Sequence, residues 1–356
     1  MTQKAQVLMV AAGTGGHIFP ALAVANRLMS QGASVAWLGT PDRMEAQLIP
    51  KAGIAFYSVR FSGLRGKGLI SALALPWRLM RATWACLHLL RRLETRVVVC
   101  FGGYVTVPAG LAAKCLGKTL IIHEQNAVAG SANRLLSRFS DQTLSAFPGV
   151  LPGTQAVGNP LKPEFERAMQ PSKRLLGRSG SLRLLIVGGS LGAQALNEMV
   201  PQALALLPES QRPEVLHQSG AQHVERLQDS YTQMGVRATV TPFIDDMPEA
   251  FAWADCVIAR AGAMTVFEVA AQGCAALFVP LPHAIDDHQT LNAKWLVDQQ
   301  AAWMMEQSAM TAEGLSTLLG SLSRDACLRL AEKAYSLGQR GATHEVASRC
   351  WLTLAL

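Results

Sequence analysis

The chain of 356 residues is longer than an ordinary single domain, and its composition, 50% apolar with 16% charged residues, is typical of globular proteins. This composition excludes a disordered or fibrous chain. The longest apolar segment, residues 69–90, is interrupted by Pro76, Arg78, Arg81 and His88, so it is excluded as a membrane span.

The charge of the chain is unevenly distributed. Residues 1–160 contain 16 Lys and Arg against 5 Asp and Glu, whereas residues 161–356 contain 16 against 20. The basic first part predicts an anionic partner, and nucleic acid, anionic lipid headgroups and a pyrophosphate-bearing ligand all satisfy that condition. The seven cysteines form no CxxC pair or metal-ligand spacing, and the N-terminus lacks a signal-peptide pattern, so we expect a cytoplasmic protein with buried, reduced thiols.

Short apolar runs alternate with longer helical patterns along the first part of the chain. The expected strands are residues 6–11, 34–38, 97–100 and 119–122, and the expected helices are residues 19–29, 44–52, 107–116 and 129–136. This alternation predicts a parallel sheet with helices on both faces.

Prolines and glycines crowd residues 147–169, which predicts a linker. Strands are expected again at residues 182–187, 214–217, 238–240, 256–259 and 275–279. We therefore predict an α/β protein of two doubly wound, Rossmann-like domains facing a cleft, residues 1–158 and 159–340. Residues 341–356 are expected to form a terminal helix that can pack back on the N-terminal domain.

Three glycine-rich loops follow expected strands, at residues 12–17, 101–104 and 188–193. Glycine lets the backbone approach a ligand closely, and the following helix start favours negative charge. The first loop departs from GxGxxG, and no acidic residue closes the second strand, so a nicotinamide cofactor is disfavoured. Simple tight turns remain the alternative explanation.

A fourth strand-loop-helix passage, residues 259–268, ends in Glu268. Its carboxylate can accept hydrogen bonds from a ribose diol, or it can simply be a favourable charge near a helix start. The polar segment 280–292 contains His283, Asp286, Asp287 and His288, which could suggest a metal site. We expect no metal and no cofactor, because such loops usually serve caps and turns and helix starts can neutralise a diphosphate.

Seven motifs in one order resemble the MurG family across nearly the whole chain. They are GTGGHIFP at residues 13–20, FGGYVTVP at 101–108, HEQN at 123–126, VGNP at 157–160, GGSLGA at 188–193, FIDDM at 243–247 and RAGAMTVFE at 260–268. The resemblance implies the GT-B fold and an inverting transfer of N-acetylglucosamine (GlcNAc) from UDP-GlcNAc to the C4 hydroxyl of N-acetylmuramic acid (MurNAc) in lipid I. The product, lipid II, serves peptidoglycan synthesis.

The resemblance also implies a domain for each substrate, with the acceptor and membrane on the N-terminal domain and UDP-GlcNAc on the C-terminal one. It places uracil at the backbone of Ile244, the diphosphate at Ser190 and the ribose at Glu268. The complete set of implied donor contacts is Thr14, Gly15, Gly16, Asn126, Lys162, Ser190, Ile244, Ala263, Met264, Thr265, Val266, Phe267, Glu268 and Gln289. Lys162 departs from the usual arginine, and lysine lacks the bidentate fork; Ala12 and His288 also depart from the family pattern.

Inversion needs a base for the acceptor hydroxyl. His17 is the preferred candidate, because an ordinary histidine pKa of about 6.5 leaves it mostly neutral in the cytoplasm. Glu124 in the HEQN motif is the competing candidate. His17 could instead cap its helix or bind acceptor phosphate.

The segment 71–92 places Arg78, Arg81, His88 and Arg92 at helical spacing, bordered by Trp77 and Trp84. Such an edge suits a helix that lies among anionic headgroups, although an ordinary core-packed helix has the same pattern. With a lipid-linked acceptor, we expect a peripheral protein on the cytoplasmic face of the bacterial inner membrane.

Two other functional classes stay open. Another GT-B glycolipid or natural-product glycosyltransferase, or a UDP-GlcNAc 2-epimerase, would share the fold. A non-catalytic nucleotide-sugar-binding protein would share the loops. Nucleic acid is not an expected partner, because aromatic platforms and a recognition helix are missing from the sequence.

Overall fold

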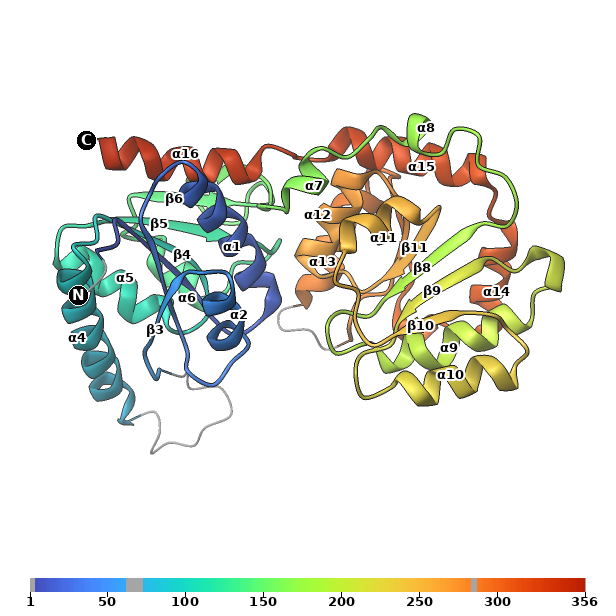
Figure 1. Ribbon diagram of the computed structural model, residues 1–356, viewed down its shortest axis with the longest axis horizontal. Coiled ribbons are helices and arrows are strands. Elements are labelled where there is room, and N and C mark those ends of the chain that lie inside the picture. The colour runs from blue at the N-terminus through green and yellow to red at the C-terminus, as the bar shows by residue number, and fades with distance from the viewer. Residues whose placement is uncertain (1–3, 62–72, 283–286, 356) are drawn as a thin grey trace. The chain divides into compact units, whose positions relative to one another are not determined.

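The computed structural model describes residues 4–61, 73–282 and 287–355 (Figure 1). The chain divides into two compact units, one formed by Met1–Lys162 with Arg340–Leu356 and the other by Pro163–Gln339. The C-terminal segment therefore belongs to the same unit as the N-terminus.

The first unit is built on a seven-stranded sheet whose strand pairs are all parallel, in the order β3-β2-β1-β4-β5-β6-β7. Its strands are β1 Val7–Ala11, β2 Val35–Gly39, β3 Ala55–Ser58, β4 Val97–Gly102, β5 Thr119–Glu124, β6 Gln142–Ser145 and β7 Gln155–Ala156. Its helices are α1 Gly15–Ser30, α2 Glu45–Lys51, α4 Leu75–Leu93, α5 Thr106–Cys115, α6 Ser131–Leu136 and α16 Ala342–Ala355.

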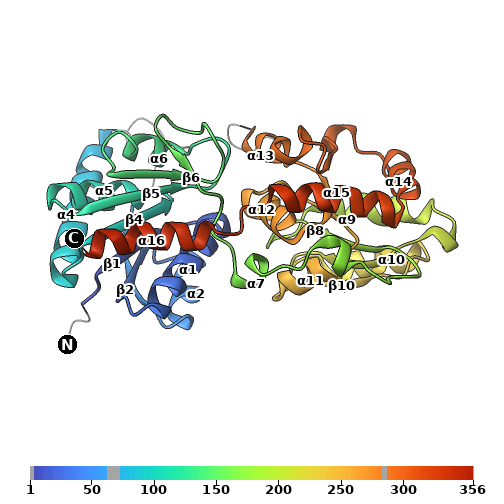
Figure 2. The same cartoon turned by 90° about the horizontal axis from the view of Figure 1, so that it is seen from above.

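Both faces of this sheet are buried, which explains its nearly continuous apolar strands. Alternate residues of β1 face opposite sides: Val7 and Met9 join a core with α1, α2 and α16, whereas Leu8 and Val10 join a core with α4, α5 and α6. Figure 2 shows α16 running over the sheet beside α1.

The C-terminal helix α16 is fixed by specific bonds as well as by packing. Arg27 of α1 bonds His344 at 3.4 Å, and the Trp351 indole N–H donates to the Gln31 side chain. Arg96 Nη1 donates to the Leu354 carbonyl oxygen at 2.8 Å. The last turns of the chain are therefore part of the fold of the first unit.

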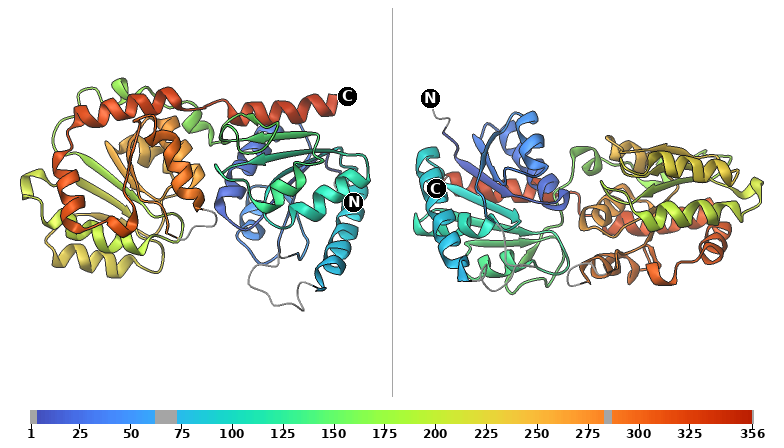
Figure 3. Two further views of the ribbon diagram at one scale, coloured as in Figure 1. Left: turned by 180° about the vertical axis from the view of Figure 1, so that it is seen from behind. Right: turned by 90° about the horizontal axis from the view of Figure 1, so that it is seen from below.

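The second unit has a six-stranded sheet of parallel pairs in the order β10-β9-β8-β11-β12-β13 (Figure 3). Its strands are β8 Arg183–Val187, β9 Glu214–Gln218, β10 Thr239–Thr241, β11 Cys256–Ala259, β12 Ala275–Phe278 and β13 Trp303–Met304. Its helices are α7 Pro163–Glu166, α8 Pro171–Arg174, α9 Gln194–Ala205, α10 Val224–Gln233, α11 Met247–Trp253, α12 Ala263–Gln272, α13 His288–Val297, α14 Ala312–Ser321 and α15 Arg324–Leu337.

The two doubly wound parallel sheets confirm the predicted fold class, but two expectations about secondary structure, and the burial expected of one cysteine, were wrong. Helix α1 begins at Gly15 rather than at residue 19, so His17 lies in its first turn and Pro20 lies inside it. Strand β7 lies within the segment expected to be only a linker.

Six of the cysteines are buried, whereas Cys115 is exposed. Among the described residues, no helix combines the length and apolarity needed to span a bilayer.

A buried carboxylate joins the start of the second unit to its sheet. Asp255, just before β11, is fully buried and accepts from Arg178 Nη1 at 2.9 Å, from Arg324 Nη2 at 3.1 Å and from the Arg183 amide at 3.0 Å. Removing one member of such a cluster leaves buried charge without compensation.

Replacing Asp255 with Ala is therefore expected to lower the free energy of unfolding by about 3–5 kcal/mol, measured by urea denaturation. Glu214→Ala is the matched control, because its ion pair with Arg183 is 3.7 Å long and largely exposed and should contribute at most about 1 kcal/mol. Equal, small losses in both variants would contradict the buried role of Asp255.

Candidate functional site

In each sheet the chain first adds strands toward one edge and then returns to the middle to add strands toward the other edge. We call the place between these two halves of the sheet the reversal point. In the first unit this point lies between β1 and β4, and in the second it lies between β8 and β11. Ligands of doubly wound proteins bind beyond the carboxyl ends of the strands at such a point. The glycine loops after β1, β4 and β8 and the passage after β11 all lie there, so sequence and topology indicate the same two regions.

In the first unit, the loops after β1 and β4 touch through glycine. A Cβ atom on Gly103, whose φ is +91°, would lie 2.6 Å from the Ala12 carbonyl oxygen. A Cβ atom on Gly102, whose φ is +137°, would lie 2.6 Å from Cδ2 of His17. The His17 ring therefore occupies space that is open only because residue 102, at the end of β4, has no side chain.

His17 has a defined orientation in the first turn of α1. Its Nδ1 lies 3.3 Å from the Ala12 carbonyl oxygen. Because a carbonyl oxygen only accepts, Nδ1 carries the proton in this contact and Nε2 is the basic nitrogen. The N-cap residue Thr14 makes no side-chain cap, and Gly15 and Gly16 form the start of the helix, where amide groups favour an anion.

Two buried side chains that the sequence analysis missed, Glu45 and Trp37, hold the first glycine loop and the end of β1 in place through hydrogen bonds. Glu45 is fully buried; its Oε2 accepts from the Gly13 amide at 3.4 Å, and its Oε1 accepts from Thr40 Oγ1 at 2.7 Å. The Trp37 indole donates to the Ala11 carbonyl oxygen at 3.0 Å. An acid opening a helix was the only signal for Glu45, and that pattern is too common to indicate a role.

Glu124, the competing base candidate, is only 2% exposed and carries four hydrogen bonds. Oε1 accepts from the amide and the side chain of Asn126, and Oε2 accepts from the Gly130 amide at 3.0 Å and Asn133 Nδ2 at 2.9 Å. This arrangement fixes the HEQN turn and the half-buried Asn126.

His123, next in the same motif, is a structural histidine. Its Nε2 donates to the Gly158 carbonyl oxygen at 2.9 Å, and its Nδ1 accepts from Gln125 at 3.0 Å. Burial lowers the pKa of His123 to about 4, against a smaller raising effect of the bond to Gly158. The neutral ring thus ties the HEQN motif to the VGNP motif, helped by Asn159 donating to the Gln125 carbonyl oxygen.

In the second unit, the reversal point carries a pocket of about 720 Å³, a size typical of ligand sites. The whole glycine loop 188–193 forms one wall, and Arg260, Gly262 and Thr265 from the β11–α12 passage form another. The first turns of α9 and three further side chains complete the lining: Gln194, Ala195, Glu198, Leu281, Gln289 and Gln307.

The helices that start at this pocket have no side-chain caps. The N-cap residues of α9 and α12 are Ala193 and Gly262, and neither makes a cap bond through a side chain. By contrast, Thr311 and Ser323 cap α14 and α15 elsewhere in the unit. The N-cap residues of α9 and α12 therefore provide no side-chain acceptor for the first amides, and such helix starts favour an anion.

Arg260 is a pocket residue to which the sequence analysis gave no role. Its Nη1 donates to the Val279 and Pro280 carbonyl oxygens, each at 3.0 Å, and its Nη2 donates to Gln307 Oε1 at 2.6 Å. Burial holds the pKa of Arg260 below its usual value, but an arginine stays charged. A fixed cation thus lies in the wall of the pocket.

Of the expected donor contacts, Ser190, Thr265 and Gln289 line this pocket together. Residues 263–268 form the first turns of α12, where Ala263, Val266 and Phe267 are buried while Met264, Thr265 and Glu268 are half-buried. Ile244 is buried and donates its amide to Gln218. The other expected residues belong to the first unit: Thr14, Gly15, Gly16, His17, Glu124, Asn126 and Lys162.

Comparison with known proteins identifies the family. The glycosyltransferase family 28 N-terminal domain matches residues 7–145, and the glycosyltransferase family 28 C-terminal domain matches residues 183–346. A Paracidovorax citrulli protein named UDP-N-acetylglucosamine–N-acetylmuramyl-(pentapeptide) pyrophosphoryl-undecaprenol N-acetylglucosamine transferase is 52% identical over 98% of this chain and 99% of its own length. The crystal structure of Acinetobacter baumannii MurG is 43% identical, with a TM-score of 0.85 over 97% of this chain and 99% of that chain. The chain belongs to the MurG family.

Membership in the MurG family confirms the resemblance of the motifs and makes the chain a glycosyltransferase. The calicheamicin glycosyltransferase CalG4, 15% identical with a TM-score of 0.69 and covering 99% of both chains, shares the fold. The GT-B architecture predicted for the two domains is thereby confirmed.

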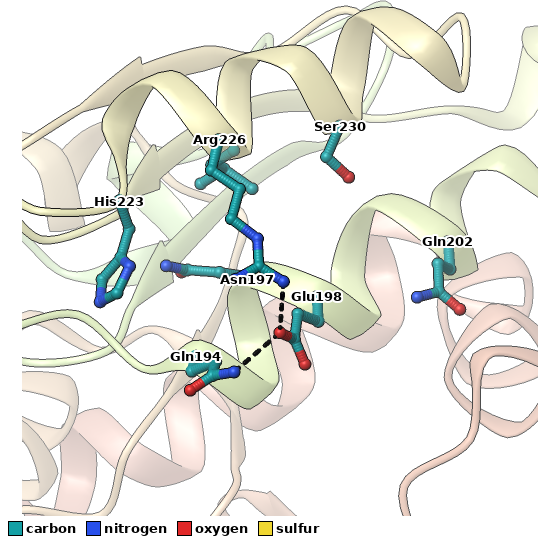
Figure 4. Close-up of a pocket in the computed structure, with 8 residues that line it drawn as sticks. Gln194, Asn197, Glu198, Gln202, His223, Arg226 and Ser230 are labelled. Carbon is teal, nitrogen blue, oxygen red and sulfur yellow. Dashed lines mark hydrogen bonds and ion pairs between the residues drawn. The ribbon is translucent and has the colours of Figure 1, made fainter.

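A smaller pocket of about 270 Å³ lies between α9 and α10 and is not part of any MurG motif (Figure 4). Glu198 accepts from Gln194 at 2.9 Å and from Arg226 at 3.0 Å at its edge. Gln194 and Glu198 also border the larger pocket, so the two hollows adjoin at the first turns of α9.

The described residues contain no group of three or more His, Cys, Asp or Glu side chains arranged to hold a metal ion. Of the polar loop considered for metal binding, His283 and Asp286 lie outside the described residues. Asp287 caps no helix amide through its side chain and accepts from Thr290 Oγ1 at 2.7 Å.

Gly102→Ala is expected to reduce glycosyl transfer about 100-fold, because the new methyl would displace the His17 ring, and a shift of about 1 Å can cost that much in rate. Gly32→Ala is the control: its φ of +93° also strains an alanine backbone, but nothing lies within 4 Å of the added atom. Turnover at the parental rate by a folded Gly102→Ala variant would show that the His17 position does not matter.

Proposed function

We propose that this MurG-family chain transfers GlcNAc from UDP-GlcNAc to the C4 hydroxyl of MurNAc in lipid I, with inversion, and so forms lipid II for peptidoglycan. The observation that carries the proposal is the pocket of the second unit, where a glycine loop, two helix starts and Arg260 converge at the β8/β11 reversal point. The Paracidovorax citrulli relative, named as a transferase between these substrates, supports the choice.

The donor diphosphate is assigned to Ser190 and to the amides at the starts of α9 and α12. Helix starts and oriented amides stabilise phosphate charge and the charge that develops on the leaving UDP. Arg260 adds a permanent positive charge, already oriented by three hydrogen bonds. With these groups the diphosphate is neutralised without a metal ion or another cofactor.

The nucleoside is assigned to the neighbouring loops of the same unit. The half-buried Glu268 would accept from the ribose hydroxyls, and the backbone of Ile244 would meet uracil. Gln289, whose Oε1 accepts from the Leu281 amide, retains a donating NH₂ group for the sugar or phosphates. Thr14, Gly15, Gly16, Asn126 and Lys162 of the first unit complete the proposed set.

We assign the base role to His17 and a positioning role to Glu124. The Ala12 contact leaves Nε2 of His17 as the basic nitrogen, so it can take the proton of the acceptor hydroxyl. Glu124 has both oxygens engaged by four donors and orients Asn126. Proton transfer through Glu124 would have to break bonds that hold the HEQN turn.

The direct test is incubation of the protein with UDP-GlcNAc and a short-chain lipid I analogue, with and without a chelator. We expect UDP release that requires the acceptor and persists in the chelator. His17→Ala should lower kcat by about 100- to 10,000-fold while UDP binding stays, as for loss of a general base. His344→Ala on α16 is the control and should keep the parental rate. UDP release without acceptor would contradict the proposal and indicate another enzyme that cleaves UDP-GlcNAc. No release at all would also contradict it and favour a non-catalytic nucleotide-sugar binder.

Helix α4 supports a peripheral location on the anionic, cytoplasmic face of the inner membrane. Trp77, Met80 and Trp84 follow one face and are 66%, 56% and 63% exposed, while the opposite face is buried. Arg81 is exposed beside them, and Arg78 is half-buried. Exposed tryptophans with adjacent arginines are typical of interfacial helices and would bring the enzyme to a lipid-linked acceptor.

Trp77→Ala with Trp84→Ala should reduce cosedimentation with vesicles of phosphatidylcholine and phosphatidylglycerol by tenfold or more. Arg78→Gln with Arg81→Gln should weaken binding to these vesicles roughly 30-fold, at about 1 kcal/mol per charge, but not binding to neutral vesicles. Leu206→Ala with Leu352→Ala removes equally exposed apolar side chains elsewhere and should have no effect. Unchanged binding of the tryptophan variant would contradict the surface assignment.

A further inference from the structure

Strand β9 occupies the position between β8 and β10, and its last residue reaches both neighbours. Gln218 Nε2 donates to the Gly189 carbonyl oxygen at 2.8 Å, in the loop after β8. Gln218 Oε1 accepts from the Ile244 amide at 2.9 Å, in the segment after β10. The side chain is 2% exposed, so a single buried amide joins the two loops.

The backbone around Gln218 is packed closely enough to transmit its position. A Cβ on Gly192 would lie 1.8 Å from the Ser219 carbonyl oxygen, and a Cβ on Gly220 would lie 2.1 Å from the Leu191 carbonyl oxygen. The Ser219 amide donates to the Thr241 carbonyl oxygen at 2.9 Å. The three loops after β8, β9 and β10 therefore form one block with Gln218 inside it.

The end of β9 is itself anchored by a buried polar chain. Asn197 Nδ2 donates to the Ser219 carbonyl oxygen at 3.0 Å, and Asn197 Oδ1 bonds His217 at 3.0 Å. His217 in turn bonds the Tyr231 hydroxyl at 2.8 Å. The strand end does not depend on Gln218 for its own position, so the loss of this side chain would act on the flanking loops.

The neutral carboxamide of Gln218 makes both contacts. An ionised glutamate could still accept from the Ile244 amide but could not donate to the Gly189 carbonyl oxygen, and a methionine could do neither. A buried carbonyl or amide that loses its partner incurs a desolvation penalty, so the loops would move to recover hydrogen bonds.

We propose that Gln218 is a positioning residue for the donor, which holds the loop assigned to the diphosphate and the segment assigned to uracil at a fixed separation. The inference rests on the proposed function, since that function assigns the phosphates to Ser190 of the loop 188–193, with the helix starts beside it, and the base to Ile244. Gln218 acts through these two loops and does not itself touch the reacting atoms. A nucleotide spans both loops, so their spacing sets how well its base and its phosphates can be held together.

The test compares three variants with the intact chain in donor kinetics and in UDP and uridine binding by calorimetry. Gln218→Met should raise KM for UDP-GlcNAc about tenfold or more, with KM for the acceptor analogue unchanged. Gln218→Glu should bind uridine nearly as well as the parent but bind UDP at least tenfold more weakly, because only the phosphate-loop contact is lost. Gln272→Met, which replaces another buried amide at the far end of α12, is the control and should leave both KM values unchanged.

Different outcomes separate this inference from the proposed function. If the parent chain transfers GlcNAc but the Gln218 variants keep its donor KM and UDP affinity, the positioning role is wrong. If acceptor KM rises as much as donor KM and the thermal midpoint also falls, Gln218 has a merely structural role, and the inference is overturned. If the parent chain does not transfer GlcNAc, the proposed function fails first, and UDP and uridine binding still report on the coupling of the two loops.

Discussion

The site depends on contacts between neighbouring loops that only glycine permits. In the second unit, added Cβ atoms on Gly192 and Gly220 would lie about 2 Å from carbonyl oxygens of the facing loop. In the first unit, Gly103 lies against the Ala12 carbonyl oxygen and Gly102 against the His17 ring. Real Cβ atoms do not approach other atoms so closely, so any side chain there would force the loops apart.

Each unit supports its glycine loop with a buried polar side chain from a neighbouring element. Glu45 accepts from the Gly13 amide in the first unit, and Gln218 donates to the Gly189 carbonyl oxygen in the second. Such bonds orient the peptide groups of a loop that glycine would otherwise leave flexible. Two groups assigned to chemistry are therefore held on backbone with little freedom: His17 in the first turn of α1, directly after the first glycine loop, and Ser190 in the loop 188–193. Electrostatic stabilisation of a transition state requires such fixed groups.

The sequence predicted the parallel sheets well, because buried parallel strands are short apolar runs between helical patterns. It was wrong about the start of α1, since two glycines and Pro20 have poor helix propensity and the helical turn at Gly15 depends on tertiary packing. Strand β7 was missed because it has two exposed residues in a segment rich in proline and glycine. Glycine loops revealed the site regions, but Gln218 and Glu45 act on partners 26 to 32 residues away, and no local pattern indicates such contacts.

A crystal structure of the protein with bound UDP tests the central claim most directly. The account predicts pyrophosphate oxygens within hydrogen-bonding distance of Ser190 and the loop amides of residues 188–193, uracil at Ile244, and the ribose hydroxyls at Glu268. It further predicts that the glycine loops keep the conformations described above when the nucleotide binds. A nucleotide bound elsewhere, or a loop 188–193 that separates from Ser219 and Gly220 to admit it, would contradict the account.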